Sequence, residues 1–170
     1  AEPSGIVFVN PTKDWNVSKD GKSWYFFKEE NGRLCPAYSE VITGPSGKKY
    51  YFGFDASMWL GYFTETFDDG RVIHYMTNDS GEIQETNDWV KYDGDWYFWR
   101  DGDILKNGVY DIWGKKYYFD YDGVMQLGRI DIYENDNQKL YLTDSSGAII
   151  SSPGWNWYKN NWYYMIRSEE

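Results

Sequence analysis

The sequence predicts an all-β fold, a solenoid of stacked β-hairpins with about seven repeats of roughly 22 residues. Three observations support this prediction. Tyrosine recurs at a regular interval along nearly the whole chain, and turn residues flank most of these tyrosines. No window shows the sustained apolar period of an amphipathic helix. Because a single hairpin is at best marginally stable in water, repeated hairpins are expected to bury their faces by stacking.

Seven anchor tyrosines define the repeats, with steps of 26, 24, 22, 21, 23 and 22 residues between them. They are Tyr25, Tyr51, Tyr75, Tyr97, Tyr118, Tyr141 and Tyr163. A Gly, Asp or Asn cluster usually precedes the anchor, and a second turn signal usually follows and leads into a connecting loop. An apolar residue such as Met58 or Met125 comes next. This order is typical of a β-hairpin followed by a loop. We therefore expect residues 13–170 to form the repeat solenoid and residues 1–12 an N-terminal cap or partial repeat.

The fourth repeat shows the pattern most clearly. It reads from Trp89 to Trp99, with Asp93-Gly94 as a two-residue hairpin loop. Strand alternation then places Trp89 and Trp96 on the same face as diagonal neighbours. The two indoles are expected to form two walls of an aromatic cavity.

The composition narrows the possible functions. Ten Trp, seventeen Tyr and nine Phe are too many for one buried core in a chain of 170 residues, so many rings are expected to be half exposed. The net charge of −10 argues against binding to nucleic acid or to an anionic membrane. No apolar run is long enough for membrane insertion. The single cysteine, Cys35, excludes an intramolecular disulfide framework and a cysteine-based zinc site, and we expect neither a metal nor a cofactor.

No constellation of catalytic residues is evident, and we expect no catalytic residue in this chain. Most acidic residues lie in recurring turns beside Gly or Asn, where Asp is favoured for backbone reasons. His74 is the only histidine and stands at an aromatic position of the repeat. The chain lacks the nucleophile-elbow, phosphate-loop and zinc-protease motifs. We therefore expect a non-enzymatic chain, with any catalytic domain elsewhere in a longer parent protein.

The repeat resembles the choline-binding, or cell-wall-binding, repeats of Gram-positive surface proteins and some phage lysins. Residues 89–98 match the first half of that unit, residues 117–128 match the second half, and residues 155–164 match the unit again. The resemblance covers roughly residues 13 to 165. Similar repeats occur in the glucan-binding domains of glucosyltransferases and in large clostridial toxins. Those relatives favour Tyr-Tyr-Phe and often lack the first Trp, and this chain mixes both styles.

The resemblance implies ligand sites. In the choline-binding family, two Trp of one hairpin and an aromatic ring of the next unit enclose a quaternary ammonium. The first implied site comprises Trp89 and Trp96, with Tyr110 or Tyr117 as the third ring and Met125 as its floor. The second comprises Trp15 and Trp24, with Tyr38 or Tyr50. The last pair, Trp155 and Trp162, is expected to be a cap, a dimer surface or an open site.

The resemblance and the physics of aromatic rings together predict a function. A quaternary ammonium has no N–H to donate, so ring faces and burial of its methyl groups must hold it. We expect a non-catalytic module, secreted or at the cell surface, that binds the choline or phosphocholine of teichoic acid. Two alternatives stay open. One is a module that binds a glucan or another cell-wall or extracellular glycan through stacking on sugar rings. The other is a structural or protein-binding scaffold with degenerate sites. A homodimer through a terminal hairpin is compatible with each of these functions, because an uncapped stack leaves an apolar end.

Overall fold

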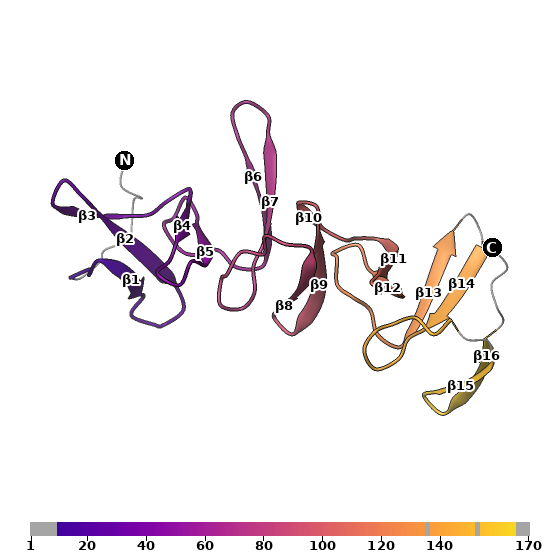
Figure 1. Cartoon of the computed structure of the whole chain (residues 1–170). Coiled ribbons are helices and arrows are strands. Elements are labelled where there is room, and N and C mark those ends of the chain that lie inside the picture. Colours follow the sequence, from indigo (N-terminus) through magenta and orange to yellow (C-terminus); the bar gives the residue numbers. More distant parts are fainter. Residues whose placement is uncertain (1–9, 135–136, 152–153, 166–170) are drawn as a thin grey trace. The chain divides into compact units, whose positions relative to one another are not determined.

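The computed structural model describes residues 10–134, 137–151 and 154–165, and these residues form only strands, turns and loops (Figure 1). Sixteen short strands make seven sheets of two or three strands, with no helix among the described residues. The all-β prediction and the antiparallel hairpin as its building unit are therefore confirmed. The N-terminal cap expected over residues 1–12 lies almost wholly outside the described residues.

The chain divides into two compact units, one of residues 1–94 and 99–103 and the other of residues 95–98 and 104–170. The first seven strands are β1 (Asp14–Val17), β2 (Trp24–Glu30), β3 (Arg33–Pro36), β4 (Glu40–Thr43), β5 (Lys49–Phe52), β6 (Tyr62–Thr66) and β7 (Val72–Met76). One sheet of three strands follows, with β8 (Asp88–Tyr92), β9 (Asp95–Arg100) and β10 (Asp103–Ile104). The last six are β11 (Gly108–Ile112), β12 (Lys115–Phe119), β13 (Arg129–Glu134), β14 (Asn137–Leu142), β15 (Gly154–Tyr158) and β16 (Asn161–Met165).

The hairpin turns have the left-handed backbone that their residues favour. Asp93 and Gly94 both have positive φ, 49° and 88°. A two-residue hairpin loop needs positive φ at both residues to match the right-handed twist of its strands. The two-residue loop predicted at this position is therefore confirmed. Asn31 and Gly32 also have positive φ, but they join β2 directly to a third strand, β3, where the sequence suggested a connecting loop.

The register of the first hairpin places two tryptophans on one face. Trp15 pairs with Phe26 and Val17 pairs with Trp24, so Trp15 and Trp24 are diagonal neighbours. The Trp15 ring packs against a small core of the first unit. That core consists of buried Phe26, Ala37 and Phe52, with Trp15, Ile42, Tyr50 and Met58 packed against it.

The apolar residue that recurs after the second turn links successive hairpins through the backbone. In the first unit the Met58 N–H donates to the Trp24 carbonyl at 2.8 Å, and the Ile83 N–H donates to the Lys49 carbonyl at 2.9 Å. The second unit repeats these bonds from Met125 to Trp96 at 2.8 Å and from Ile149 to Lys116 at 2.7 Å. Each of these four residues also forms a bridge with its own hairpin. Within each unit, therefore, a hairpin is bonded to the one before it.

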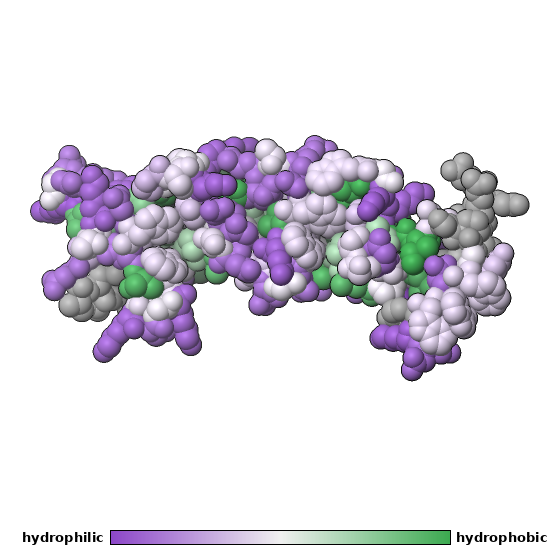
Figure 2. All heavy atoms as spheres, turned by 60° about the horizontal axis from the view of Figure 1, so that its bottom comes forward, coloured by the Kyte–Doolittle hydropathy of each residue, from purple (hydrophilic) through white to green (hydrophobic). Residues whose placement is uncertain are grey.

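Much of the aromatic surface is exposed, as the composition predicts. The face in Figure 2 is mostly hydrophilic or intermediate, with the most apolar residues (green) in separate patches. The exposed rings include Trp24, Phe54, Trp96, Trp113, Tyr121, Tyr133, Trp155, Trp157, Trp162 and Tyr164. Only part of the ring surface is therefore used to hold the hairpins together.

Candidate functional site

The first unit contains a hollow of about 530 Å³ with aromatic walls. Its lining consists of Trp15, Trp24, Tyr50, Met58, Leu60, Lys22, Asp79 and Ser80. Three successive hairpins and their turns supply these residues. Trp15 and Trp24 come from β1 and β2, Tyr50 comes from β5, and Asp79 and Ser80 come from the turn after β7. The site therefore depends on how the hairpins stack within the unit.

The Trp15 ring stands at a steep angle to each of the other two rings. The Trp15 and Trp24 centroids are 6.2 Å apart with 79° between the ring planes. The Trp15 and Tyr50 centroids are 4.7 Å apart with planes at 83°. Trp15 thus forms a wall almost perpendicular to the other two rings. The Trp24 side chain remains 43% exposed, which leaves part of its ring accessible to a ligand.

The apolar side of the hollow is formed by Met58 and Leu60. A glycine of the next turn, Gly81, lies directly against these two side chains. A Cβ atom at Gly81 would lie 2.5 Å from the Met58 sulfur and 3.2 Å from Leu60 Cδ2. The close approach of this glycine therefore helps to fix the position of the thioether.

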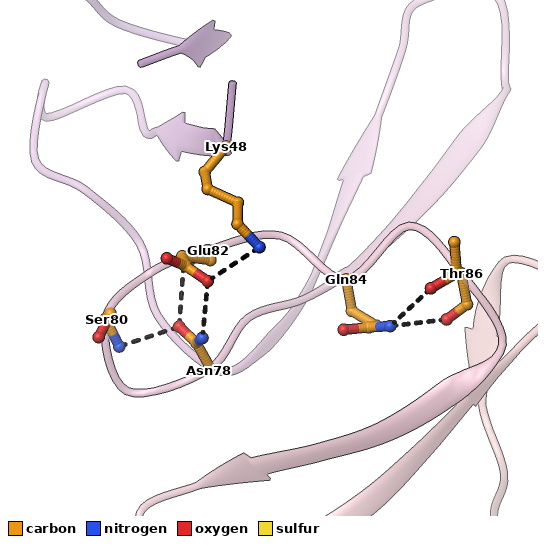
Figure 3. A network of polar contacts seen from close by, with 6 residues as sticks. All are labelled: Lys48, Asn78, Ser80, Glu82, Gln84 and Thr86. Carbon is orange, nitrogen blue, oxygen red and sulfur yellow. Dashed lines mark hydrogen bonds and ion pairs between the residues drawn. The ribbon is translucent and has the colours of Figure 1, made fainter. Parts of the chain in front are cut away.

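A polar network holds the turn that carries Asp79 and Ser80 (Figure 3). The side-chain oxygen of Asn78 accepts the N–H groups of Ser80 and Glu82, both at 3.0 Å. Its amide donates to the Glu82 carboxylate at 3.2 Å, and Lys48 pairs with that carboxylate at 3.6 Å. Asp120 and Asp144 play the part of Asn78 in their own turns. The carboxylate of each accepts two backbone N–H groups, as the Asn78 side-chain oxygen does. The frequent Asp and Asn residues thus stabilise turns, as their sequence context indicates.

The β1–β2 loop that carries Lys22 is also held by internal hydrogen bonds. Ser18 Oγ donates to the Asp20 carboxylate at 2.6 Å, and the Lys22 N–H donates to the same oxygen at 3.1 Å. These hydrogen bonds lower the pKa of Asp20, so the carboxylate that organises the loop is ionised at neutral pH. The loop is two residues longer than the one between Trp89 and Trp96 in the fourth repeat.

The residues of the site predicted at Trp89 and Trp96 are divided between the two units. Trp89 belongs to the first unit, whereas Trp96, Tyr117 and Met125 belong to the second. The Met125 N–H donates to the Trp96 carbonyl, as the Met58 N–H does to Trp24. By this register Trp96 corresponds to Trp24 and Met125 to Met58. Whether the four side chains form one cage stays a prediction.

The hydrogen bonds between hairpins also show which of Tyr110 and Tyr117 corresponds to Tyr50 of the first unit. The Lys49 carbonyl just before Tyr50 accepts the Ile83 N–H, and the Lys116 carbonyl just before Tyr117 accepts the Ile149 N–H. Tyr117 therefore corresponds to Tyr50. Tyr110 is its cross-strand partner and donates its hydroxyl to the Lys106 carbonyl at 2.7 Å. The second unit also contains a hollow of about 350 Å³, which is lined by Leu127, Gly128, Thr143, Asp144 and Ser145.

The last hairpin presents an exposed aromatic face. Trp155 and Trp162 line a hollow of about 440 Å³. Trp157 pairs directly with Trp162 and Trp155 with Tyr164, so the four rings share one face of the hairpin. All four side chains are more than half exposed. No ring of another hairpin lines this hollow among the described residues.

The structure brings some predicted residues together and leaves others apart. Tyr50 lines the first hollow, whereas Tyr38 does not and is exposed. The sequence reasoning missed Leu60, Lys22, Asp79 and Ser80. Leu60 had a signal, because a Met-x-Leu-Gly segment occurs both at residues 58–61 and at residues 125–128. The other three carry no repeated signal, since they come from turns whose residues differ between repeats.

Comparison with known proteins gives one match in sequence. No family model matches the chain. The chain is 32% identical over 151 residues to glucosyltransferase-S of Streptococcus mutans serotype c. This alignment covers 89% of the chain but only 10% of the glucosyltransferase, so the chain spans about a tenth of that protein's length.

The solved structures that match this chain include choline-binding proteins and an endolysin. CbpJ from Streptococcus pneumoniae gives a TM-score of 0.47 at 20% identity, with 91% of this chain and 64% of CbpJ covered. Choline-binding protein F of the same species gives 0.43 at 22% identity, with 86% and 61% covered. The pneumococcal cell wall endolysin from phage Cp-1, complexed with choline, gives 0.44 at 27%, with 65% and 30% covered.

The described residues include no helix that is long and apolar enough to cross a membrane. Antiparallel hairpins rich in aromatic residues recur through both units. The match in sequence falls on a glucosyltransferase, one of the protein classes in which such repeats were expected. The predicted resemblance to choline-binding, or cell-wall-binding, repeats and to the related repeats of glucosyltransferases is therefore confirmed.

Proposed function

We propose that the chain is a non-catalytic cell-surface binding module that captures the choline of teichoic acids in aromatic cages between successive hairpins. The observation that carries this proposal is the hollow in the first unit, where Trp15, Trp24 and Tyr50 stand around an apolar floor that includes Met58. The full set of hairpins is proposed to stack as one solenoid of about seven repeats, from residue 13 to residue 170.

Ring faces suit a quaternary ammonium because it has no N–H for a hydrogen bond. Each cation–π contact contributes roughly 0.5–2 kcal/mol, and Trp is the best ring. Three rings therefore supply a few kcal/mol, and about 4 kcal/mol corresponds to a Kd of about 1 mM. Contact of the methyl groups with Met58 and Leu60 adds a hydrophobic contribution. Binding at one site is expected to be weak.

Several weak sites on one chain gain affinity for a polymer. We propose a second cage of Trp89, Trp96, Tyr117 and Met125, and a third, more open site at Trp155 and Trp162. A teichoic acid presents its choline groups repeatedly, so binding at one site raises the effective concentration at the next. The chain would then attach firmly to a surface although each cage releases choline quickly.

A glycan-binding module is the second candidate, and two observations favour it. The relative in sequence is a glucosyltransferase. The exposed face of β15 and β16 also presents four aromatic rings, which can stack on the C–H face of a sugar. In both candidates we place the protein outside the cell, secreted or on the cell wall, as a non-catalytic part of a longer protein. A homodimer through the last hairpin is proposed as well.

Titration with choline chloride tests the proposal through tryptophan fluorescence. Sodium chloride at matched ionic strength and a soluble glucan serve as parallel titrations. We expect a saturable change with choline, and a loss of at least one site in Trp24→Ala. Trp113→Ala is the matched control, because Trp113 is 72% exposed in the β11–β12 turn and lines none of the three hollows.

Two other results would contradict choline binding, and a third would contradict its assignment to the hollow of the first unit. A response to glucan without one to choline would establish the carbohydrate-binding alternative. Silence with both ligands would favour the scaffold alternative, in which the rings only stack. Equal losses in Trp24→Ala and Trp113→Ala would show that the fluorescence change does not report the hollow of the first unit.

A further inference from the structure

The hollow of the first unit contains opposite charges as well as rings. Lys22 lies on its lining from the β1–β2 loop, and Asp79 lies on it from the turn after β7. A quaternary ammonium alone gains nothing from a lysine at this position, because like charges repel. A ligand that carries an anionic group close to its ammonium group complements both side chains.

The Lys22 ammonium is available for such a ligand. Four other lysines of the first unit form ion pairs with glutamates: Lys13, Lys28, Lys48 and Lys49. The Lys22 ammonium forms none with the residues that the structure describes. Its backbone is fixed by the hydrogen bond to Asp20, so the residue is held beside Trp24. The side chain therefore lines the hollow without being held in an ion pair, although the Asp79 carboxylate lies on the same lining.

The corresponding site of the second unit provides an internal comparison. Lys22 precedes Trp24 by two residues, and the residue two before Trp96 is Gly94. Gly81 and Gly147 occupy equivalent positions, against Met58 and Met125, so Asp79 corresponds to Ser145. Neither charge is thus present at the equivalent position of the second unit, and in the first unit the longer β1–β2 loop supplies the lysine.

We infer that Lys22 and Asp79 make the hollow of the first unit a zwitterion site that prefers a phosphodiester-linked quaternary ammonium to free choline. Asp79 and the rings of Trp15, Trp24 and Tyr50 face the ammonium, and Lys22 faces the phosphate. This inference rests on the proposed function, since it assigns a ligand class to the same site. Two sources share this chemistry, the phosphocholine of a teichoic acid and the head group of phosphatidylcholine.

Binding of choline and of glycerophosphocholine to the whole chain tests the inference, by calorimetry at low and at high salt. In Lys22→Gln we expect the affinity for glycerophosphocholine to fall about two- to fivefold at low salt, because exposed charge pairs are weak. The affinity for choline should stay equal or rise slightly. Added salt should shrink the preference for glycerophosphocholine in the unmodified chain and not in Lys22→Gln.

Matched variants separate the roles of the two charges. Lys19→Gln removes the same charge from the same loop but not from the lining, and should leave both affinities unchanged. Asp79→Asn should weaken both ligands, because it removes the negative charge, while the amide oxygen of asparagine can still accept the Asp93 N–H that Asp79 Oδ1 accepts at 2.7 Å. Vesicles of phosphatidylcholine and purified phosphocholine-bearing teichoic acid distinguish the two sources of the ligand.

Several outcomes would overturn the inference and leave the choline proposal intact. Equal losses for both ligands in Lys22→Gln are one such result, and equal losses in Lys19→Gln are another. An unmodified chain that prefers free choline is a third. If the unmodified chain binds neither ligand, or if Trp24→Ala binds both as well as the unmodified chain does, the proposed function fails together with the inference.

Discussion

Tyr38 and Tyr50 both follow the first tryptophan pair, and only their place in the fold separates them. Tyr50 packs against Trp15 and lines the hollow, whereas Tyr38 is exposed away from it. Replacing Tyr50 by leucine keeps an apolar side chain on the core but removes the ring. We expect Tyr50→Leu to lower choline affinity about three- to tenfold.

Tyr38→Leu is the matched control for that variant and should bind choline as the unmodified chain does. Fluorescence titration of both variants measures the difference, with circular dichroism as a check that each is folded. A loss in Tyr38→Leu with none in Tyr50→Leu would mean that the third ring has been assigned to the wrong tyrosine.

The tyrosines on the other face of the hairpins serve a different purpose. Burial raises the pKa of Tyr51, and the charge and hydrogen bonding of Glu65 raise it further. The pKa of Tyr75 is raised by the same causes. The folded chain therefore keeps both phenols protonated at a pH where the unfolded chain, with a pKa of about 10, begins to ionise them.

The contribution of these two phenols to the stability of the first unit should consequently be constant below about pH 10 and fall as the pH rises further. The sign follows because the unfolded chain loses protons that the folded chain retains. Tyr51→Phe removes one of these titrating groups. The free energy of unfolding should therefore fall less steeply with pH, by up to about 1.4 kcal/mol per pH unit. Urea unfolding from pH 8 to pH 11 measures it, and Tyr121→Phe, at an 81% exposed ring, is the control. An unchanged slope in Tyr51→Phe would contradict the prediction.

At the scale of the element, two glycines allow the effects of backbone and packing to be separated. Gly70 and Gly81 have nearly the same φ, +83° and +80°, so alanine strains the backbone at either position. A Cβ at Gly70 meets nothing within 4 Å, whereas one at Gly81 meets Met58 and Leu60. The first substitution adds strain alone, and the second also displaces the floor of the hollow.

We expect Gly70→Ala to lower the free energy of unfolding by about 1–2 kcal/mol and to leave choline affinity unchanged. Gly81→Ala should cost about 1–3 kcal/mol more and should weaken choline binding as well, because Met58 must move. Urea unfolding and fluorescence titration of the same preparations give both quantities. Equal binding by the two variants would show that the position of Met58 does not matter for the ligand.

The elements were largely predictable from the sequence because their turns are encoded locally. Asp93-Gly94 specifies a two-residue hairpin loop through the positive φ that both residues tolerate. The bonds between hairpins were not predictable, since they join backbone groups far apart in sequence, such as those of Met58 and Trp24. The period pointed to an apolar residue at that position without revealing that its N–H reaches the preceding hairpin.

At the scale of the whole molecule, the site also combines residues that local sequence predicts with residues that only the stacking of hairpins brings together. Trp15 and Trp24 were predictable as a pair, because strand alternation fixes diagonal neighbours on a hairpin. Lys22, Asp79 and Ser80 were not, because their place depends on how three hairpins stack and on a loop of unusual length. Ring positions follow the repeat, whereas the charged residues that tune one site against another depart from it.

The number of working sites is a property of the whole chain that unfolding measures. A ligand that binds only the folded chain stabilises it by RT ln(1 + [L]/Kd) per site. Well above Kd, each tenfold rise in choline therefore adds about 1.4 kcal/mol per site to the free energy of unfolding. Sites at Trp24, Trp96 and Trp162 predict a total of about 4 kcal/mol per tenfold rise.

Urea unfolding at a series of choline concentrations gives this slope, with sodium chloride holding the ionic strength constant. Trp24→Ala should lower the slope by the contribution of one site, about 1.4 kcal/mol per tenfold rise, and Trp113→Ala should not change it. The unmodified chain could instead show the slope of a single site, about 1.4 kcal/mol per tenfold rise in choline. If Trp24→Ala abolished that slope, binding would be confined to the first unit. Such a result would leave the rings of the second unit free for the glycan-binding or scaffold role, and would show that attachment cannot rely on repeated capture by one chain.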